Sequence, residues 1–199
     1  MTSKQIQKST QQYFHQTQDI LGRVDSLACA QLVQILWQAY LRDQQIFFAG
    51  NGGSASAATH LASDIGKNTI KNPQNNKEKR FKTFSLTDNV AWITALGNDL
   101  SYSDIFVEQL KNFGQSNDVL FVISASGNSP NVLKAATWAK NNHLKTVGLL
   151  GFDGGKLKDI LDTCVIIPIK NYGIVEAIHG IIHHYIVDTL TQLKNNEQK

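Results

Sequence analysis

Cysteine and proline are scarce in this chain, and long apolar runs are absent. Its 199 residues include two cysteines and three prolines. Cys29 and Cys164 lie far apart and neither belongs to a C-x-x-C pair, which excludes a zinc ribbon and a thioredoxin-like redox motif. We expect two buried, reduced thiols. With 42% hydrophobic and 18% charged residues, the composition indicates an ordinary globular protein and excludes the disordered and fibrous classes.

Targeting and membrane-spanning segments are also absent. The first twelve residues, MTSKQIQKSTQQ, are polar and lack the apolar core of a secretory signal. No segment approaches the ~20 apolar residues that cross a bilayer. We therefore expect a cytoplasmic protein with no membrane partner. The net charge of +3 comes from dispersed lysines, and we interpret the densest basic group, residues 77–82, as a solvated loop that binds no nucleic acid directly.

A length of 199 residues suits one domain, and no internal repeat divides it. Residues 1–42 are predicted to form two helices, at 5–21 and 27–41, of which the second is apolar on more than one face and needs two partners. Residues 45–195 are predicted to form the core. The only stretch that looks like a linker, residues 68–79, is polar and is interpreted as a surface loop.

Short apolar runs alternate with helical segments throughout the predicted core. The predicted strands are residues 46–49, 83–86, 119–123, 146–150 and 165–169. The predicted helices are residues 55–67, 89–96 with a continuation at 104–113, 130–142, 156–161 and 175–194. Such alternation is typical of a parallel sheet covered on both faces, so the fold class is α/β, with a doubly wound five-stranded sheet.

The first predicted strand runs into a glycine loop, Gly50-Asn51-Gly52-Gly53, directly before a helix. Glycines let backbone N–H groups approach a ligand closely, and the helix N-terminus favours anionic groups. The loop lacks the lysine of a P-loop and the spacing of a G-x-G-x-x-G motif, so it gives little support to nucleotide binding. A plain strand-to-helix turn is the structural alternative.

The third predicted strand ends in a serine loop, Ser124-Ala125-Ser126-Gly127-Asn128-Ser129, and Pro130 then opens a helix. Ser129 is well placed as the N-cap, with proline at the first helical position. Three hydroxyls beside a helix N-terminus indicate a phosphate site, because capping alone does not explain Ser124 and Ser126. In a 2-1-3-4-5 strand order, both loops face one crevice at the topological switch point.

Two helices carry the titratable side chains. His60 and Asp64 are four residues apart on one helix and project from the same face. The last helix carries Glu176, His179, His183 and His184 in an otherwise apolar stretch. Spacing from Glu176 does not choose between His183 and His184. Histidine and carboxylate ligands suit Zn²⁺, although the same residues serve acid–base chemistry without a metal.

At these motifs the chain resembles the phosphoheptose isomerases, which are sugar isomerase (SIS) domain enzymes that interconvert sedoheptulose 7-phosphate and D-glycero-D-manno-heptose 7-phosphate. The resemblance covers nearly the whole chain. The motifs that carry it are GNGGSASAATHLASD at 50–64, ALGND at 95–99, SDIF at 103–106, SASGNS at 124–129, GFDGGKL at 151–157 and VEAIHGIIHH at 175–184.

The resemblance implies a role for each matching residue. The residues implied to bind the substrate are Asn51, Gly52, Gly53, Asn98, Asp99, Ser124, Ala125, Ser126, Ser129 and Glu176. The residues implied to bind one Zn²⁺ per subunit are His60, Asp64, Glu176 and His184, so the resemblance selects His184 over His183. The resemblance also implies a homotetramer with active sites at subunit boundaries, in which residues 1–42 serve oligomerisation.

Two positions depart from the family pattern. Asp64 stands where the family has a catalytic glutamate, and Glu176 stands where it has a metal-contacting glutamine.

The expected chemistry is proton transfer between C1 and C2 through an enediol. Asp64 is the base, helped or replaced by Glu176, His184 is the acid or base at the oxygens, and Zn²⁺ is the Lewis acid.

Two other functions remain open for a chain of this pattern. The Thr-Asp-Asn-Val run at 87–90 is similar to that of a SIS-fold protein that binds the bacterial replication initiator without catalysis. A third alternative is a regulatory SIS domain that senses a sugar phosphate without converting it. Turnover of the sugar separates the enzyme from both alternatives, since fold alone does not fix function.

Overall fold

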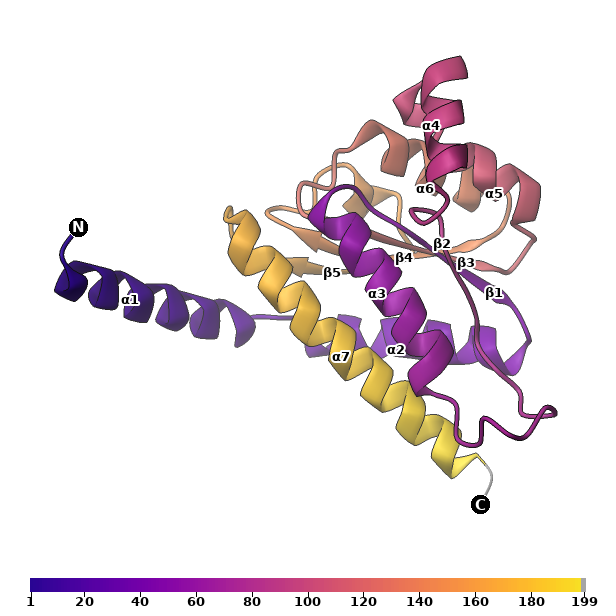
Figure 1. Cartoon of the computed structure of the whole chain (residues 1–199), viewed down its shortest axis with the longest axis horizontal. Coiled ribbons are helices and arrows are strands. Elements are labelled where there is room, and N and C mark those ends of the chain that lie inside the picture. The colour runs from indigo at the N-terminus through magenta and orange to yellow at the C-terminus, as the bar shows by residue number, and fades with distance from the viewer. Residues whose placement is uncertain (198–199) are drawn as a thin grey trace.

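The computed structural model describes residues 1–197 and contains a five-stranded parallel sheet with helices on both faces (Figure 1). The strands are β1 Gln45–Ala49, β2 Lys82–Ser85, β3 Val119–Ser124, β4 Lys145–Gly151 and β5 Thr163–Ile167. Their order is β2-β1-β3-β4-β5. This confirms the α/β class and the doubly wound strand order, and it places the ends of β1 and β3 side by side.

Alternate residues of the central strands face two separate apolar cores. On β1, Ile46 and Phe48 join one core, whereas Phe47 and Ala49 join the other. All four are buried because both faces of a parallel sheet are covered by crossover helices. The sheet therefore holds the carboxyl ends of its strands rigidly along one edge.

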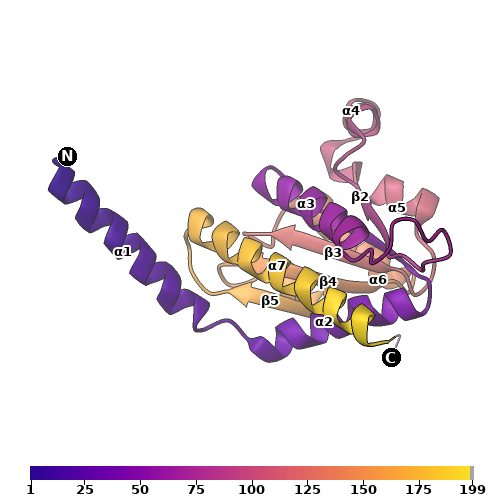
Figure 2. The same cartoon turned by 60° about the horizontal axis from the view of Figure 1, so that its bottom comes forward.

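The first face carries α2 Ser26–Leu41, α3 Gly53–Asn68 and α7 Tyr172–Asn196, and the second carries α5 Val107–Phe113 and α6 Pro130–Asn141. Helices α3 and α7 pack side by side (Figure 2). Both begin at the carboxyl edge of the sheet and run in the same direction. Residues at the same distance from the carboxyl edge on these two helices therefore lie close together.

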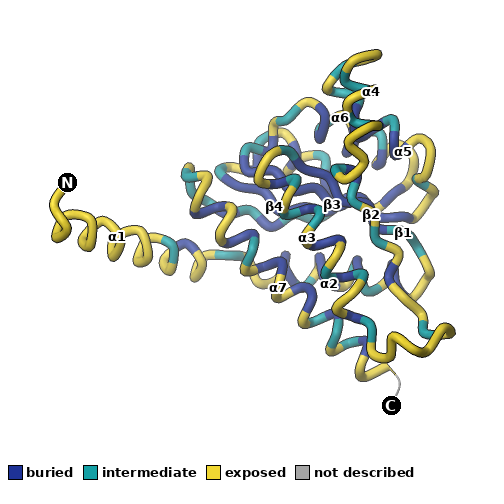
Figure 3. Tube along the Cα trace, viewed as in Figure 1, coloured by how far each residue is buried: buried dark blue, intermediate teal, exposed yellow. Residues whose placement is uncertain are grey.

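Helix α1, Ser3–Leu21, extends away from the body of the chain (Figures 1 and 2). Ile20 is its only buried residue, and Figure 3 shows nearly all of the rest of the helix as exposed, apart from the half-buried Thr17. Phe14 and Ile6 are 65% and 53% exposed. Among the described residues, no single helix is long and apolar enough to cross a membrane, and α1 and α2 pass that test only as a pair bent by 68°.

Three predicted elements differ from the structure. Residues 156–161 form only the short 3₁₀ helix η2, Leu157–Asp159. The continuation at 104–113 is broken, because α4 Val90–Asp99 is followed by η1 Tyr102–Asp104 and then by α5. Strand β5 ends two residues early because Pro168 has no N–H to donate to the sheet. In addition, Cys164 is half-buried rather than buried.

Candidate functional site

The glycine loop and the start of α6 are joined by two hydrogen bonds between side-chain amides. Asn51 Nδ2 donates to Asn131 Oδ1 over 2.8 Å, and Asn131 Nδ2 donates to Asn51 Oδ1 over 2.9 Å. Tyr102 donates its hydroxyl hydrogen to the same Asn51 oxygen over 3.1 Å. Gly52 has φ +53°, which favours glycine at this turn. The glycine and serine loops therefore lie together at the carboxyl edge, as the strand order predicts.

The serine loop holds its hydroxyl groups in a defined orientation. Ser124 Oγ accepts the N–H of Gly127 over 3.1 Å, and Ser126 Oγ accepts the N–H of Asn128 over 3.3 Å. Ser129 occupies the N-cap of α6, as predicted, but its side chain makes no capping hydrogen bond. A hydroxyl that accepts from the backbone still has its own hydrogen to donate. These serines can thus donate to the oxygens of an anion, and Ala125 between them is buried.

The turn after β4 supports the serine loop from behind. Gly127 has φ +62°, and a Cβ at this position would lie only 2.0 Å from the carbonyl oxygen of Gly154. The N–H of Leu157 donates to the carbonyl of Gly127 over 3.0 Å, and the N–H of Lys156 donates to Asn128 Oδ1 over 3.1 Å. Glycine is required where the two turns meet, because any side chain would separate them.

Three histidines and one aspartate from α3 and α7 meet in a group that we call the imidazole cluster, His60, Asp64, His183 and His184. Asp64 Oδ2 lies 3.2 Å from His60 Nε2, 3.0 Å from His183 Nε2 and 3.9 Å from His184 Nδ1. One nitrogen of each of the three imidazoles lies within 4.8 Å of the other two. The structure thus brings His60, Asp64 and His184 together and adds His183.

The cluster suits a divalent metal ion. Burial is the main cause that lowers the pKa of His183 to about 4; neighbouring His60 and His184 lower it further, and Asp64 partly opposes them. His183 is therefore neutral at pH 7, which is the form that binds metals. Three imidazole nitrogens and a carboxylate oxygen are a donor set that Zn²⁺ takes.

Glu176 lies apart from the cluster in the same chain. Its carboxylate packs against Gly53, where an added Cβ would lie 2.8 Å from Oε1. Glu176 and His184 are eight residues apart on α7, which corresponds to about 12 Å along a helix. The structure therefore places Glu176 beside the glycine loop, and it does not bring Glu176 to the other three predicted metal ligands.

The cluster and the serine loop open into different cavities of one chain. A cavity of about 460 Å³ beside His60 is lined by Ala55, Ser56, Thr59, His60, Ser63 and Thr87. A cavity of about 500 Å³ beside the serine loop is lined by Ser126, Asn128, Phe152, Asp153, Pro168, Ile169 and Lys170. The two linings share no residue.

Asn98 and Asp99 are exposed at the end of α4, which projects from the body in Figure 2. Asn98 Nδ2 donates to Asp99 Oδ1 over 2.8 Å, and in the described part of the chain no hydrogen bond joins either side chain to the two loops. The structure therefore does not bring this predicted pair to the loops, although Tyr102, three residues later, contacts Asn51.

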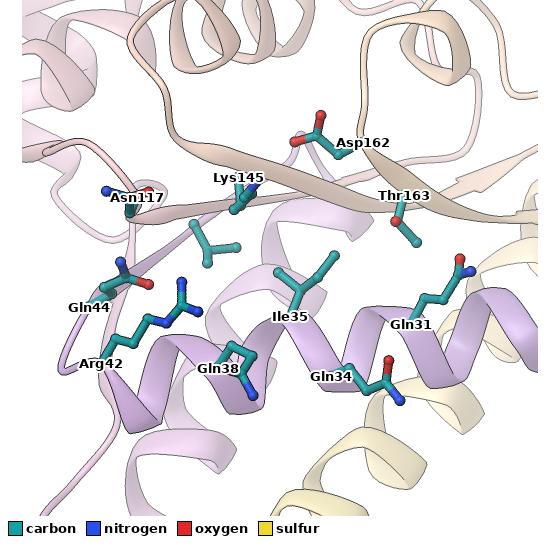
Figure 4. A pocket seen from close by; sticks show the side chains of 11 residues that line it. Gln31, Gln34, Ile35, Gln38, Arg42, Gln44, Asn117, Lys145, Asp162 and Thr163 are labelled. Atoms are coloured by element: carbon teal, nitrogen blue, oxygen red, sulfur yellow. The ribbon is translucent and has the colours of Figure 1, made fainter.

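Another cleft, of about 480 Å³, lies between α2 and the amino ends of β3, β4 and β5 (Figure 4). Its lining consists of Gln31, Gln34, Ile35, Gln38, Arg42, Gln44, Asn117, Val119, Lys145, Asp162 and Thr163. This edge is opposite to the one that carries the two loops. It contains none of the predicted site residues and no group of histidines, so we place the chemistry at the carboxyl edge and on α3 and α7.

Comparison with known proteins finds relatives over most of the chain and solved structures of the same fold. The SIS domain family matches residues 12–151. The phosphoheptose isomerase of Helicobacter pylori is 36% identical over 164 residues, which are 82% of each chain. That of Clostridium acetobutylicum is 37% identical over 158 residues, which are 79% of this chain and 78% of that protein. The solved phosphoheptose isomerase of Francisella tularensis matches 96% of this chain and 100% of its own, with a TM-score of 0.85 at 28% identity. The chain therefore belongs to the SIS domain family and, within it, to the phosphoheptose isomerases.

Proposed function

We propose that this chain is an aldose–ketose isomerase that converts sedoheptulose 7-phosphate to D-glycero-D-manno-heptose 7-phosphate through an enediol. The observation that carries the proposal is the combination of a serine loop built to bind an anion with an imidazole cluster on adjacent helices. Family membership supports the same reaction, because the relatives named above are phosphoheptose isomerases. The initiator-binding and sensor alternatives have no comparable support.

The sugar phosphate is held by its anionic end in this proposal. Ser124, Ser126 and Ser129 donate hydroxyl hydrogens to the phosphate oxygens, and the N-terminus of α6 favours the negative charge. The backbone of Asn51, Gly52 and Gly53 lies beside the carbon atoms of the sugar. Asn98 and Asp99 are proposed to reach the sugar only from a segment that moves or from a neighbouring subunit.

One Zn²⁺ per subunit fits the imidazole cluster. We propose that His60, Asp64, His183 and His184 hold it, so that His183 occupies the place that the family resemblance gives to Glu176. When bound, Zn²⁺ supplies a Lewis acid that polarises the carbonyl and hydroxyl oxygens of the sugar. We also propose that the protein acts in the cytoplasm.

The two carboxylates differ in their freedom to act as a base. Asp64 uses Oδ2 for the imidazoles, and its Oδ1 accepts Asn68 Nδ2 over 3.0 Å. Glu176 is exposed beside Gly53, so its oxygens are accessible to a substrate. We therefore assign the carbon-bound proton to Glu176, which removes it from C1 and returns it to C2. His184 delivers a proton to O2 and accepts one from O1.

Glu176 lies beside Gly53 and His184 lies in the imidazole cluster, about 12 Å further along α7. We propose that one active site does not take both groups from the same chain. His184 has a side chain that is 62% exposed, and Ile181 and Tyr185 on the same helix are 47% and 45% exposed. We propose that a neighbouring subunit covers this face. Each active site then combines the serine and glycine loops and Glu176 of one chain with the imidazole cluster of another. A homotetramer in which the exposed side of α1 packs on its copies provides such neighbours.

The test of the reaction is direct. Purified protein is mixed with sedoheptulose 7-phosphate, with and without added Zn²⁺, and the sugar is followed by NMR. We expect signals of the aldose product. If no product forms under either condition, the isomerase proposal is wrong, and binding of the sugar without conversion would then support the sensor alternative.

A further inference from the structure

A third histidine of α7, His179, lies outside the imidazole cluster and faces the sheet. It is only 2% exposed, and its Nε2 lies 3.1 Å from the carbonyl oxygen of Leu150 on β4. A carbonyl can only accept, so Nε2 carries the proton. Nδ1 of the neutral ring is then a buried acceptor, and it has no hydrogen-bond partner among the described residues. Buried polar atoms are almost always hydrogen-bonded, so an unpaired buried nitrogen calls for an explanation.

The hydrogen bond joins two parts of the proposed active site. Leu150 is paired in the sheet with Ser124, the first residue of the serine loop. His179 lies one helical turn after Glu176. A single directional contact therefore links the helix that carries the proposed base to the strand position beside the phosphate site.

A second contact shows how closely α7 approaches the end of β4. A Cβ at Gly151 would lie 2.6 Å from Val175 Cγ1, so the helix rests directly on the strand backbone. The neighbouring buried residues on this side of α7 are Ile174, Ile178 and Ile182, which pack without directional preference. Apolar contacts of this kind fix how deep the helix lies, whereas the hydrogen bond of His179 fixes its rotation and its position along the strand.

The hydrogen-bond donor persists at physiological pH. Burial lowers the pKa of His179 to about 4, which outweighs the opposing effect of the Leu150 carbonyl. Protonation would add a hydrogen to Nδ1, where the surroundings offer no acceptor. The ring of His179 therefore stays neutral at this pH.

We propose that His179 is a positioning residue for isomerisation, whose hydrogen bond to the Leu150 carbonyl holds Glu176 in register with the phosphate bound at the serine loop. The inference rests on the proposed function, because it concerns the geometry of that reaction. It assigns a role to a residue that touches neither the substrate nor the metal.

Two substitutions at this position separate positioning from packing. In His179→Gln the side-chain amide nitrogen reaches as far from the backbone as Nε2 of histidine does, whereas in His179→Asn it falls short. Both variants lose the ring. We expect His179→Gln to keep kcat within about threefold, and His179→Asn to lose about 100-fold in kcat while KM for the sugar phosphate changes by less than about threefold, since a displacement of ~1 Å has effects of this size.

Equal kcat losses in the two variants, or a rise in KM with unchanged kcat, would overturn the role of His179. The unaltered protein gives an independent check through ¹⁵N NMR of the ring. We expect a proton on Nε2, a bare Nδ1 and no titration between pH 8 and pH 5.5. A proton on Nδ1, or titration near the ordinary pKa of histidine, contradicts the proposal even if neither variant folds. Turnover by the wild-type protein tests the proposed function separately.

Discussion

The imidazole of His183 lies within hydrogen-bonding distance of the Asp64 carboxylate, with 3.0 Å between Nε2 and Oδ2. His183 comes from α7 and Asp64 from α3, so this bond joins the two helices at the centre of the imidazole cluster. The side chain of His183 is 4% exposed and that of His184 is 62% exposed. Two adjacent histidines therefore have different tasks: one is fixed between the helices and the other faces outward.

Replacing His183 should weaken metal binding. His183→Asn removes one imidazole of the cluster. We expect its affinity for Co²⁺, used as a spectroscopic substitute for Zn²⁺, to fall by at least about 10-fold, because even the loss of a group that supports a ligand costs about 10–100-fold. The measurement is titration of the visible absorption bands of Co²⁺. His143→Asn is the matched control, because His143 is exposed and far along the chain, and asparagine tolerates its φ of +63°. Unchanged affinity in His183→Asn would remove His183 from the ligand set.

Mixed tetramers should reveal active sites shared between subunits. Glu176→Gln and His184→Asn should each be inactive alone, because each lacks one of the two proposed proton-transfer groups. If the two groups of a site come from different chains, random mixing of equal amounts should restore about a quarter of the sites in a symmetric assembly. The assay is turnover after the two variants are unfolded and refolded together. No recovery in tetramers shown to be mixed would place both groups in one chain.

The stability of the protein should fall as the pH is lowered from 6.5 towards 4. Burial lowers the pKa of His179 and of His183 to about 4, whereas an unfolded histidine titrates near ~6.5. Between these values the unfolded chain binds more protons, so the free energy of unfolding rises with pH across this interval. Urea denaturation at several pH values measures the slope. His179→Gln should flatten it, and an unchanged slope would contradict the low pKa of His179.

A buried ion pair should contribute strongly to stability. Lys194 Nζ lies 2.7 Å from Glu78 Oε1, and the two side chains are 1% and 3% exposed. Glu78→Gln leaves the buried ammonium group with the Thr69 carbonyl but without a counter-charge, which costs about 3–5 kcal/mol. Glu108→Gln, which breaks an exposed ion pair with Lys111, should cost at most about 1 kcal/mol. Chemical denaturation compares the two, and equal losses would show that Lys194 is solvated.

Acid should weaken this ion pair only at low pH. The hydrogen bond from Lys194 is the main cause that lowers the pKa of Glu78 to about 2, below the ~4.3 of an unfolded glutamate. The stabilisation is therefore complete above pH 4.3 and is lost as the pH falls through the folded pKa. This interval lies below that of the two histidines, so denaturation curves measured over the full range separate the two contributions.

Gly53 should tolerate alanine in the fold but not in the reaction. The added Cβ would lie 2.8 Å from Glu176 Oε1, and the flexible carboxylate would have to move away. We expect Gly53→Ala to lower kcat by about 10–100-fold, because displacement of a catalytic group by ~1 Å has effects of this order. Gly97→Ala is the control, since no atom lies within 4 Å of its added Cβ. It should raise the free energy of unfolding by about 0.5–1 kcal/mol, as expected for glycine in a helix interior.

The sheet was predictable from sequence because its strands are continuous apolar runs separated by helical segments. The bounds and burial of some individual elements were not predictable, because local features determine them. Pro168 ends β5 early, and residues 156–161 form only a short 3₁₀ helix, whose first residue Leu157 is hydrogen-bonded to the serine loop. The half-buried Cys164 could not be predicted from residue type, because its exposure depends on its place on the edge strand β5.

The site was predictable in its parts but not in its assembly. Helical spacing predicts that His60 and Asp64 share a face, and strand order predicts that the glycine and serine loops meet. Spacing on α7 leaves both His183 and His184 as partners of Glu176, and only the packing of α7 on α3 shows that both approach Asp64. The exposed position of Asn98 and Asp99 on α4 likewise depends on tertiary structure, which a motif does not specify.

The interlocking of Gly127 with Gly154 has a consequence for attempts to redesign this enzyme. Because the carbonyl of Gly154 fills the space where a side chain of residue 127 would be, neither turn has an independent shape. A loop graft intended to change which anion is accepted would have to transplant residues 124–129 and 151–157 as one unit. Exchanging either segment alone would leave a mismatched junction directly behind the hydroxyl groups.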